Sequence, residues 1–69
     1  MDELVFDVTQ GSDGGYVAEC LSEDIFTQAD TWEELRANVV EAVRAYYFDS
    51  EPPGQIRLHL VRDEVVSAR

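Results

Sequence analysis

Carboxylates are the side chains of this sequence with the clearest capacity for chemistry. The candidates for the ligands of a nuclease with two metal ions are Asp7, one of Glu33, Glu34 or Glu41, and Asp63. Such an enzyme requires carboxylates that converge on ions about 4 Å apart. However, 15 acidic residues among 69 place some on every element by chance, and the sequence has no lysine to hold a nucleic-acid substrate. A metal-dependent nuclease is therefore an alternative hypothesis, set against a protein without chemistry of its own.

A second possible chemistry pairs Cys20, as a nucleophile, with His59, as a base. No third residue that would orient the base accompanies them, and we expect Cys20 to pack as a small apolar side chain and His59 to face away from the core. Because Cys20 is the single cysteine, an internal disulfide is impossible. No spacing typical of metal ligands occurs, so we predict neither a metal nor a cofactor.

The element that must organise the chain is a predicted amphipathic helix over Asp30 to Tyr47. Apolar residues three or four positions apart form one stripe, which contains Trp32, Leu35, Val39, Ala42, Val43 and Tyr46. Either Asp30 or Thr31 is able to cap the N-terminus, since each precedes a glutamate by three residues. The polar residues from Asp49 onward and the Pro52-Pro53-Gly54 sequence end the helix.

Four segments with strand-like patterns surround this helix. They are Glu3 to Gln10, Tyr16 to Leu21, Ile25 to Ala29 and Gln55 to Val61. Short turns predict an antiparallel meander of the first three strands, and the helical crossover returns the fourth strand parallel to the first. Residues 1–69 are thus expected to form one α+β domain of order β-β-β-α-β, with sheet order 3-2-1-4 and the helix on one face. The other face is expected to carry some of Asp7, Thr9, Glu19, Thr27, Arg57 and His59.

The net charge of −10 is the most informative property of the composition. A strongly negative surface repels phosphate backbones, so we expect no direct binding of nucleic acid by this chain and favour a basic protein partner. The apolar runs are too short for a membrane span, which makes the cytoplasm the default location. A chain of this length buries a small core, so we also expect self-association into a homodimer or tetramer.

Two segments resemble HicB-type antitoxin domains. They are Gly14-Gly15-Tyr16-Val17-Ala18-Glu19 and Thr27-Gln28-Ala29-Asp30-Thr31-Trp32-Glu33-Glu34-Leu35. The chain departs from the family pattern at Ser22-Glu23-Asp24, where a Pro/Gly turn is usual, and at Ala29, where glycine is usual. It also stops before any C-terminal DNA-binding domain, so operator binding is not carried over. The resemblance implies a sheet similar to a partial RNase H fold, oligomerisation, and neutralisation of a small basic mRNA-cleaving toxin of the HicA type.

Two sets of contact residues follow from these expectations. The residues predicted to bind the basic partner are Asp7, Glu19, Glu33, Glu34 and Glu41. Those predicted to form the oligomer interface are Tyr47, Phe48, Val65 and Val66, although the two aromatic residues suit a toxin interface equally well. An orphan structural or regulatory relative without a toxin partner is the remaining alternative.

Overall fold

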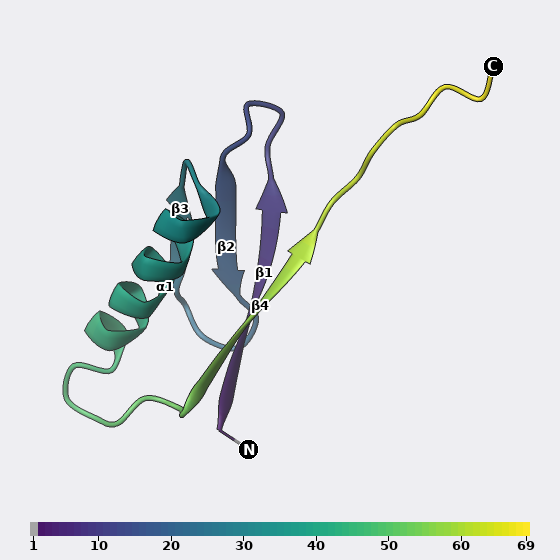
Figure 1. Cartoon of the computed structure of the whole chain (residues 1–69). Helices are drawn as coiled ribbons and strands as arrows, with labels where there is room; N and C mark the ends of the chain where they lie inside the picture. Colours follow the sequence, from purple (N-terminus) through teal and green to yellow (C-terminus); the bar gives the residue numbers. More distant parts are fainter. Residues whose placement is uncertain (1) are drawn as a thin grey trace.

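Residues 2 to 69, which the computed structural model describes, form a four-stranded sheet with one helix on one face (Figure 1). The elements are β1 (Glu3–Gln10), β2 (Tyr16–Cys20), β3 (Phe26–Ala29), α1 (Trp32–Tyr46) and β4 (Gln55–Val61). The strand order is β3-β2-β1-β4; β4 is parallel to β1, and the other neighbouring pairs are antiparallel. The α+β class and the strand order predicted from the sequence are confirmed.

The turn between β1 and β2 depends on a glycine. The amide of Gly11 donates to the carbonyl of Gly15 at 2.8 Å, and the amide of Gly14 donates to the carbonyl of Gly11 at 3.0 Å. Gly14 has a φ of 92°, a backbone conformation that side chains with a Cβ rarely adopt. The loop therefore closes tightly enough for β2 to pair directly with β1.

The N-terminus of α1 is capped by Thr31. Its hydroxyl oxygen accepts a hydrogen bond from the amide of Glu34 at 3.1 Å. Of the two capping residues that the sequence allowed, the structure therefore selects Thr31 over Asp30. The side-chain amide of Asn38 adds a second tie, donating to the carbonyl of Gln28 in β3 at 3.1 Å.

We predict that Thr31→Ala lowers the free energy of unfolding by about 1 kcal/mol, because one amide of the first turn loses its acceptor. For a domain of this size the loss corresponds to about 4–8 °C in the melting temperature. Thermal unfolding followed by circular dichroism measures it. Thr31→Ser keeps the hydroxyl and serves as the control; an equal loss in both variants would contradict the capping role.

The core lies between α1 and the helix-facing side of the sheet. Its buried side chains are Leu4, Phe6, Val8, Ala18, Cys20, Ile25, Leu35, Val39 and Val43. Alternating residues of β1 and β2 and the i, i+4 positions of α1 supply eight of the nine. Binary patterning thus selected the correct face of each of these elements.

The end of α1 corrects one prediction. Tyr46, which we assigned to the core stripe, is exposed and donates its hydroxyl to a Glu23 carboxylate oxygen at 2.8 Å. Tyr47 packs against the core instead. The buried helix positions Leu35, Val39 and Val43 advance by four residues, and the next step of four reaches position 47. The hydrogen bond to Glu23 raises the pKa of Tyr46, whereas desolvation raises that of Tyr47.

The helix covers the sheet unequally. It packs mainly against β3 and β2, and β4 lies at the other side of the sheet (Figure 1). The helix-facing side chains of β4 are consequently only half-buried at Ile56 and Leu58 and exposed at Leu60. After β4, residues 62–69 form no helix or strand and run away from the body of the molecule.

Candidate partner-binding surface

The face of the sheet opposite α1, which we call the open face, carries a row of mostly charged side chains. Asp7 of β1 lies directly opposite Glu19 of β2 on one side and His59 of β4 on the other. Glu19 in turn lies opposite Phe26 of β3. The strand registers therefore bring two of the predicted partner-binding residues, Asp7 and Glu19, side by side.

This open face differs from the predicted one at a single position in β3. Thr27 was a candidate for it, yet it pairs with Ala18 and shares the helix-facing side with the buried residue Ile25. The open face instead receives Phe26 and Gln28 from this strand. Since side chains alternate along a strand, the burial of Ile25 determines the direction of all three.

Apolar side chains surround the two carboxylates. Leu21 and Phe26 are 63% and 61% exposed. Leu21 follows the buried Cys20, and its amide donates to the carbonyl of Val5 at 3.0 Å, which places Leu21 and Val5 together on the open face. Sequence analysis placed both exposed residues in strands but did not select them as contacts. Each of them directly follows a buried residue, Cys20 or Ile25, and because side chains alternate between the two faces of a strand, each must lie on the open face.

Two side-chain contacts, one ion pair and one contact between a histidine and a carboxylate, border the row on the β4 side. Arg57 binds Glu3 at 2.8 Å, and Nδ1 of His59 lies 3.4 Å from a carboxylate oxygen of Asp7. Glu19 belongs to neither of these pairs. Asp7 and Glu19 are like charges directly opposite one another on neighbouring strands, an arrangement that destabilises a sheet and makes this part of the open face anionic.

The other predicted partner-binding residues lie elsewhere. Glu33, Glu34 and Glu41 are exposed on α1, on the far side of the sheet from Asp7. The carboxylates that suggested a two-metal nuclease are therefore not brought together. Across residues 2–69, no group of three or more His, Cys, Asp or Glu side chains is arranged to hold a metal ion.

The proposed nucleophile and base are separated as well. Cys20 is buried on the helix side, opposite Phe6, whereas His59 lies on the open face opposite Asp7. The sheet itself stands between the two side chains. Cys20 thus packs as the small apolar residue that the sequence predicted.

This chain has relatives among curated proteins. It is 37% identical over 65 residues to a UPF0150 protein of Thermotoga maritima, covering 94% of this chain and 91% of the relative. The chain belongs to the UPF0150 family. A UPF0150 protein of Archaeoglobus fulgidus is 40% identical over 53 residues, which are 77% of this chain and 79% of that protein. No family model and no solved structure matches.

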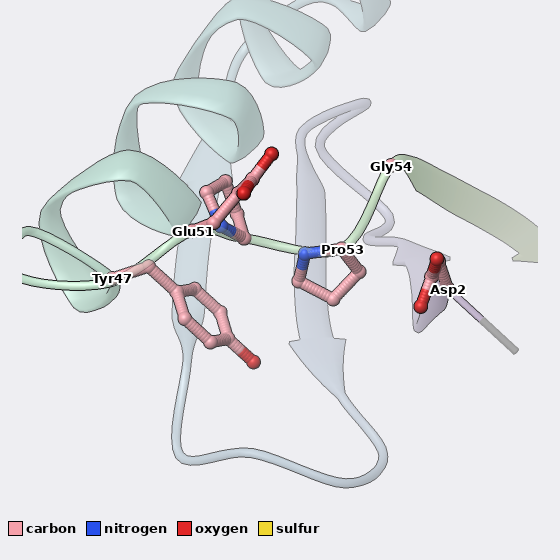
Figure 2. A pocket seen from close by; sticks show the side chains of 6 residues that line it. Asp2, Tyr47, Glu51, Pro53 and Gly54 are labelled. Atoms are coloured by element: carbon pink, nitrogen blue, oxygen red, sulfur yellow. The ribbon is translucent and has the colours of Figure 1, made fainter.

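A shallow hollow lies where α1 is joined to β4 of this UPF0150 chain. Its volume is about 440 Å³, and its lining residues are Asp2, Tyr47, Glu51, Pro52, Pro53 and Gly54. Figure 2 shows the Tyr47 ring on one side of this hollow and the Asp2 carboxylate on the other. The hollow therefore combines an aromatic ring and two proline rings with two negative charges.

The residues predicted for self-association lie at two places in the UPF0150 fold. Tyr47 and the exposed Phe48 directly follow α1, and Tyr47 lines the hollow. Val65 and Val66 are 99% and 73% exposed on the segment after β4. Within one copy, these two pairs lie at opposite ends of β4 and its extension. In the part of the chain that the structure describes, no helix has the length and apolar character needed to cross a bilayer.

Proposed function

We propose that this UPF0150 chain is an antitoxin-like binding module, which neutralises a small basic mRNA-cleaving toxin by protein contact and performs no chemistry of its own. The observation that supports this proposal best is the open face. It places the adjacent carboxylates of Asp7 and Glu19 among exposed apolar side chains, Leu21 and Phe26. A cationic protein surface with its own apolar patch is the complement of such a face.

The two kinds of side chain have separate parts in this proposal. Leu21 and Phe26 leave water when the partner docks, and such desolvated contacts supply most of the affinity of an interface. Asp7 and Glu19 select a partner with a cation at the matching position. That cation also relieves the repulsion between the two carboxylates, which the free protein retains.

The resemblance to HicB-type antitoxins supports the same function. Its first segment, Gly14 to Glu19, forms the end of the glycine turn and most of β2. Its second segment, Thr27 to Leu35, forms the rest of β3 and the first turn of α1. These segments contribute Val17, Glu19 and Gln28 to the open face. The part of the sequence that resembles the family is thus also part of the proposed contact surface.

The direct test is co-purification with the product of a neighbouring gene that encodes a basic protein of about 60–90 residues carrying a histidine placed for RNA cleavage. We expect a stable complex that abolishes the RNA cleavage of the basic protein. The association rate should fall at least tenfold between low salt and 0.5 M salt, because the range of surface charges shrinks from about 10 Å at 0.1 M to about 3 Å at 1 M.

Stopped-flow fluorescence of Trp32 or a dye-labelled partner measures this rate. A complex with a salt-independent association rate would mean that the acidic field has no part in capture. Failure to bind any basic product of a neighbouring gene would favour the orphan structural or regulatory alternative. Cleavage of RNA by this chain alone with Mg²⁺ or Mn²⁺ would overturn the proposal in favour of a nuclease.

A further inference from the structure

β4 is an edge strand whose outer side is unprotected. It pairs with β1 on one side and is last in the strand order. The amide of Gln55 donates to the carbonyl of Asp2 at 2.9 Å. Because successive residues of a strand direct their backbone groups to opposite sides, the amides and carbonyls of Ile56, Leu58 and Leu60 point outward. Natural edge strands usually block such a row with a proline, a bulge or short length, and β4 has seven residues without proline.

The same three residues are apolar and incompletely covered. Their side chains lie on the helix-facing side of the sheet, but α1 packs over β2 and β3. Ile56 and Leu58 are half-buried, and Leu60 is 39% exposed. The edge therefore presents open hydrogen-bonding groups and an apolar surface together, which is the combination that accepts another strand.

The distribution of charge indicates that the strand which joins this edge comes from a second copy of the chain. Residues 55–69 contain three of the five arginines and two of the 15 acidic residues, so the segment is slightly positive in a chain of net charge −10. The first 54 residues carry the other 13 acidic residues and two arginines, so surfaces built from them repel one another on average. The β4 edge is the place where a second copy approaches with least repulsion.

We propose that two copies of this chain form a homodimer by pairing their β4 strands in antiparallel fashion about a two-fold axis at Leu58. In this register Leu58 faces Leu58 of the second copy, and Ile56 faces Leu60 of the second copy. All three outward-pointing residues then exchange hydrogen bonds across the axis, and their side chains form one apolar row. The two sheets become one, and both open faces stay free, so this inference does not depend on the proposed function.

The segment after β4 enlarges this contact. Just past Val61, this register brings Arg62 beside Gly54 of the second copy, and the residues that follow extend toward the loop that contains Glu51 of the second copy. Glu51 and Gly54 line the hollow shown in Figure 2, which is acidic and contains the Tyr47 ring. The positive charge of Arg62 complements the acidic residues of this hollow, and the apolar side chain of Val65 suits its aromatic ring.

The first test is the mass of the full chain in solution by sedimentation equilibrium or light scattering. We expect Leu60→Pro to halve the mass, because proline removes an outward amide while the hydrogen bonds to β1 remain. Leu60→Val keeps the amide and should keep the mass. Circular dichroism confirms that both variants are folded. A monomeric wild-type chain, or a folded Leu60→Pro variant with unchanged mass, would overturn the proposal.

A second test does not rely on the folding of a proline variant. Leu58→Cys places two thiols at the axis, about 5.5 Å apart between Cα atoms, where a short bis-maleimide should link the copies. Val61→Cys is the matched control. Position 61 of one copy lies opposite position 55 of the other, six residues from its counterpart, so the two thiols are about 20 Å apart. Cys20 is buried and stays in both variants. Equal cross-linking of the two variants would refute the Leu58 axis.

Discussion

Phe6→Ala is expected to leave most of the chain unfolded. Phe6 lies in β1, which pairs with β2 and β4, and its side chain is 0% exposed. Removing a buried phenylalanine side chain costs about 3–5 kcal/mol, from lost burial and the cavity left behind. The core of a chain below about 70–80 residues rarely supplies more than about 3–5 kcal/mol. One substitution therefore removes a free energy similar to the whole stability of the isolated fold.

Urea denaturation followed by circular dichroism measures this loss. Phe48→Ala is the matched control, since it is the same chemical change at a side chain that is 82% exposed, and we expect it to change the free energy of unfolding by less than about 0.5 kcal/mol. Both variants must be compared at the same protein concentration, because dimerisation adds stability that depends on concentration. Equal destabilisation by the two variants would mean that the core does not hold the fold together as described.

The double variant Asp7→Asn, Glu19→Gln is expected to weaken binding of the basic partner about 100-fold. Each carboxylate is taken to accept a charge-assisted hydrogen bond that becomes desolvated under the partner, worth at least about 1.4 kcal/mol, or tenfold in affinity. The loss should appear mainly in the dissociation rate, because contacts within an interface govern residence time. Isothermal titration calorimetry and surface plasmon resonance with the co-purified basic protein measure it.

The matched control is Glu33→Gln, Glu41→Gln, which removes the same two negative charges from α1. If the open face makes the contact, this control changes the association rate slightly and leaves the dissociation rate unchanged. Glu19→Gln should also leave the fold intact or slightly more stable, since it removes the repulsion from Asp7. Equal losses in the two double variants would show that overall charge, rather than the open face, captures the partner.

Local patterns were sufficient for most of the fold. Period-two alternation placed Leu4, Phe6 and Val8 on the buried side of β1, and the 3.6-residue period placed Leu35 and Val39 in the core. Turn residues set the end of β1 and the start of β4 at the predicted positions. These features were predictable because each depends on a few adjacent residues and on the tendency of apolar side chains to leave water.

Patterns at the ends of elements were less reliable. The predicted stripe included Tyr46 and not Tyr47, whereas in the structure Tyr47, four residues after the buried Val43, turns toward the core. The polar side chain of Thr27 suggested a position that faces solvent. Thr27 lies two residues after the buried Ile25, however, and therefore faces the helix. In both cases packing determined the direction of a side chain whose type allowed either.

The sequence by itself determined the elements, their buried sides, and an acidic charge suited to a cationic protein. Only the tertiary structure decided which acidic residues meet, because Asp7 and Glu19 are 12 positions apart and become neighbours through the register of β1 and β2. It also decided that α1 packs over β2 and β3, so that the helix-facing side chains of β4 are only partly covered. Periodicity encodes the face on which a side chain lies, whereas its neighbours on that face depend on hydrogen-bond register between distant segments.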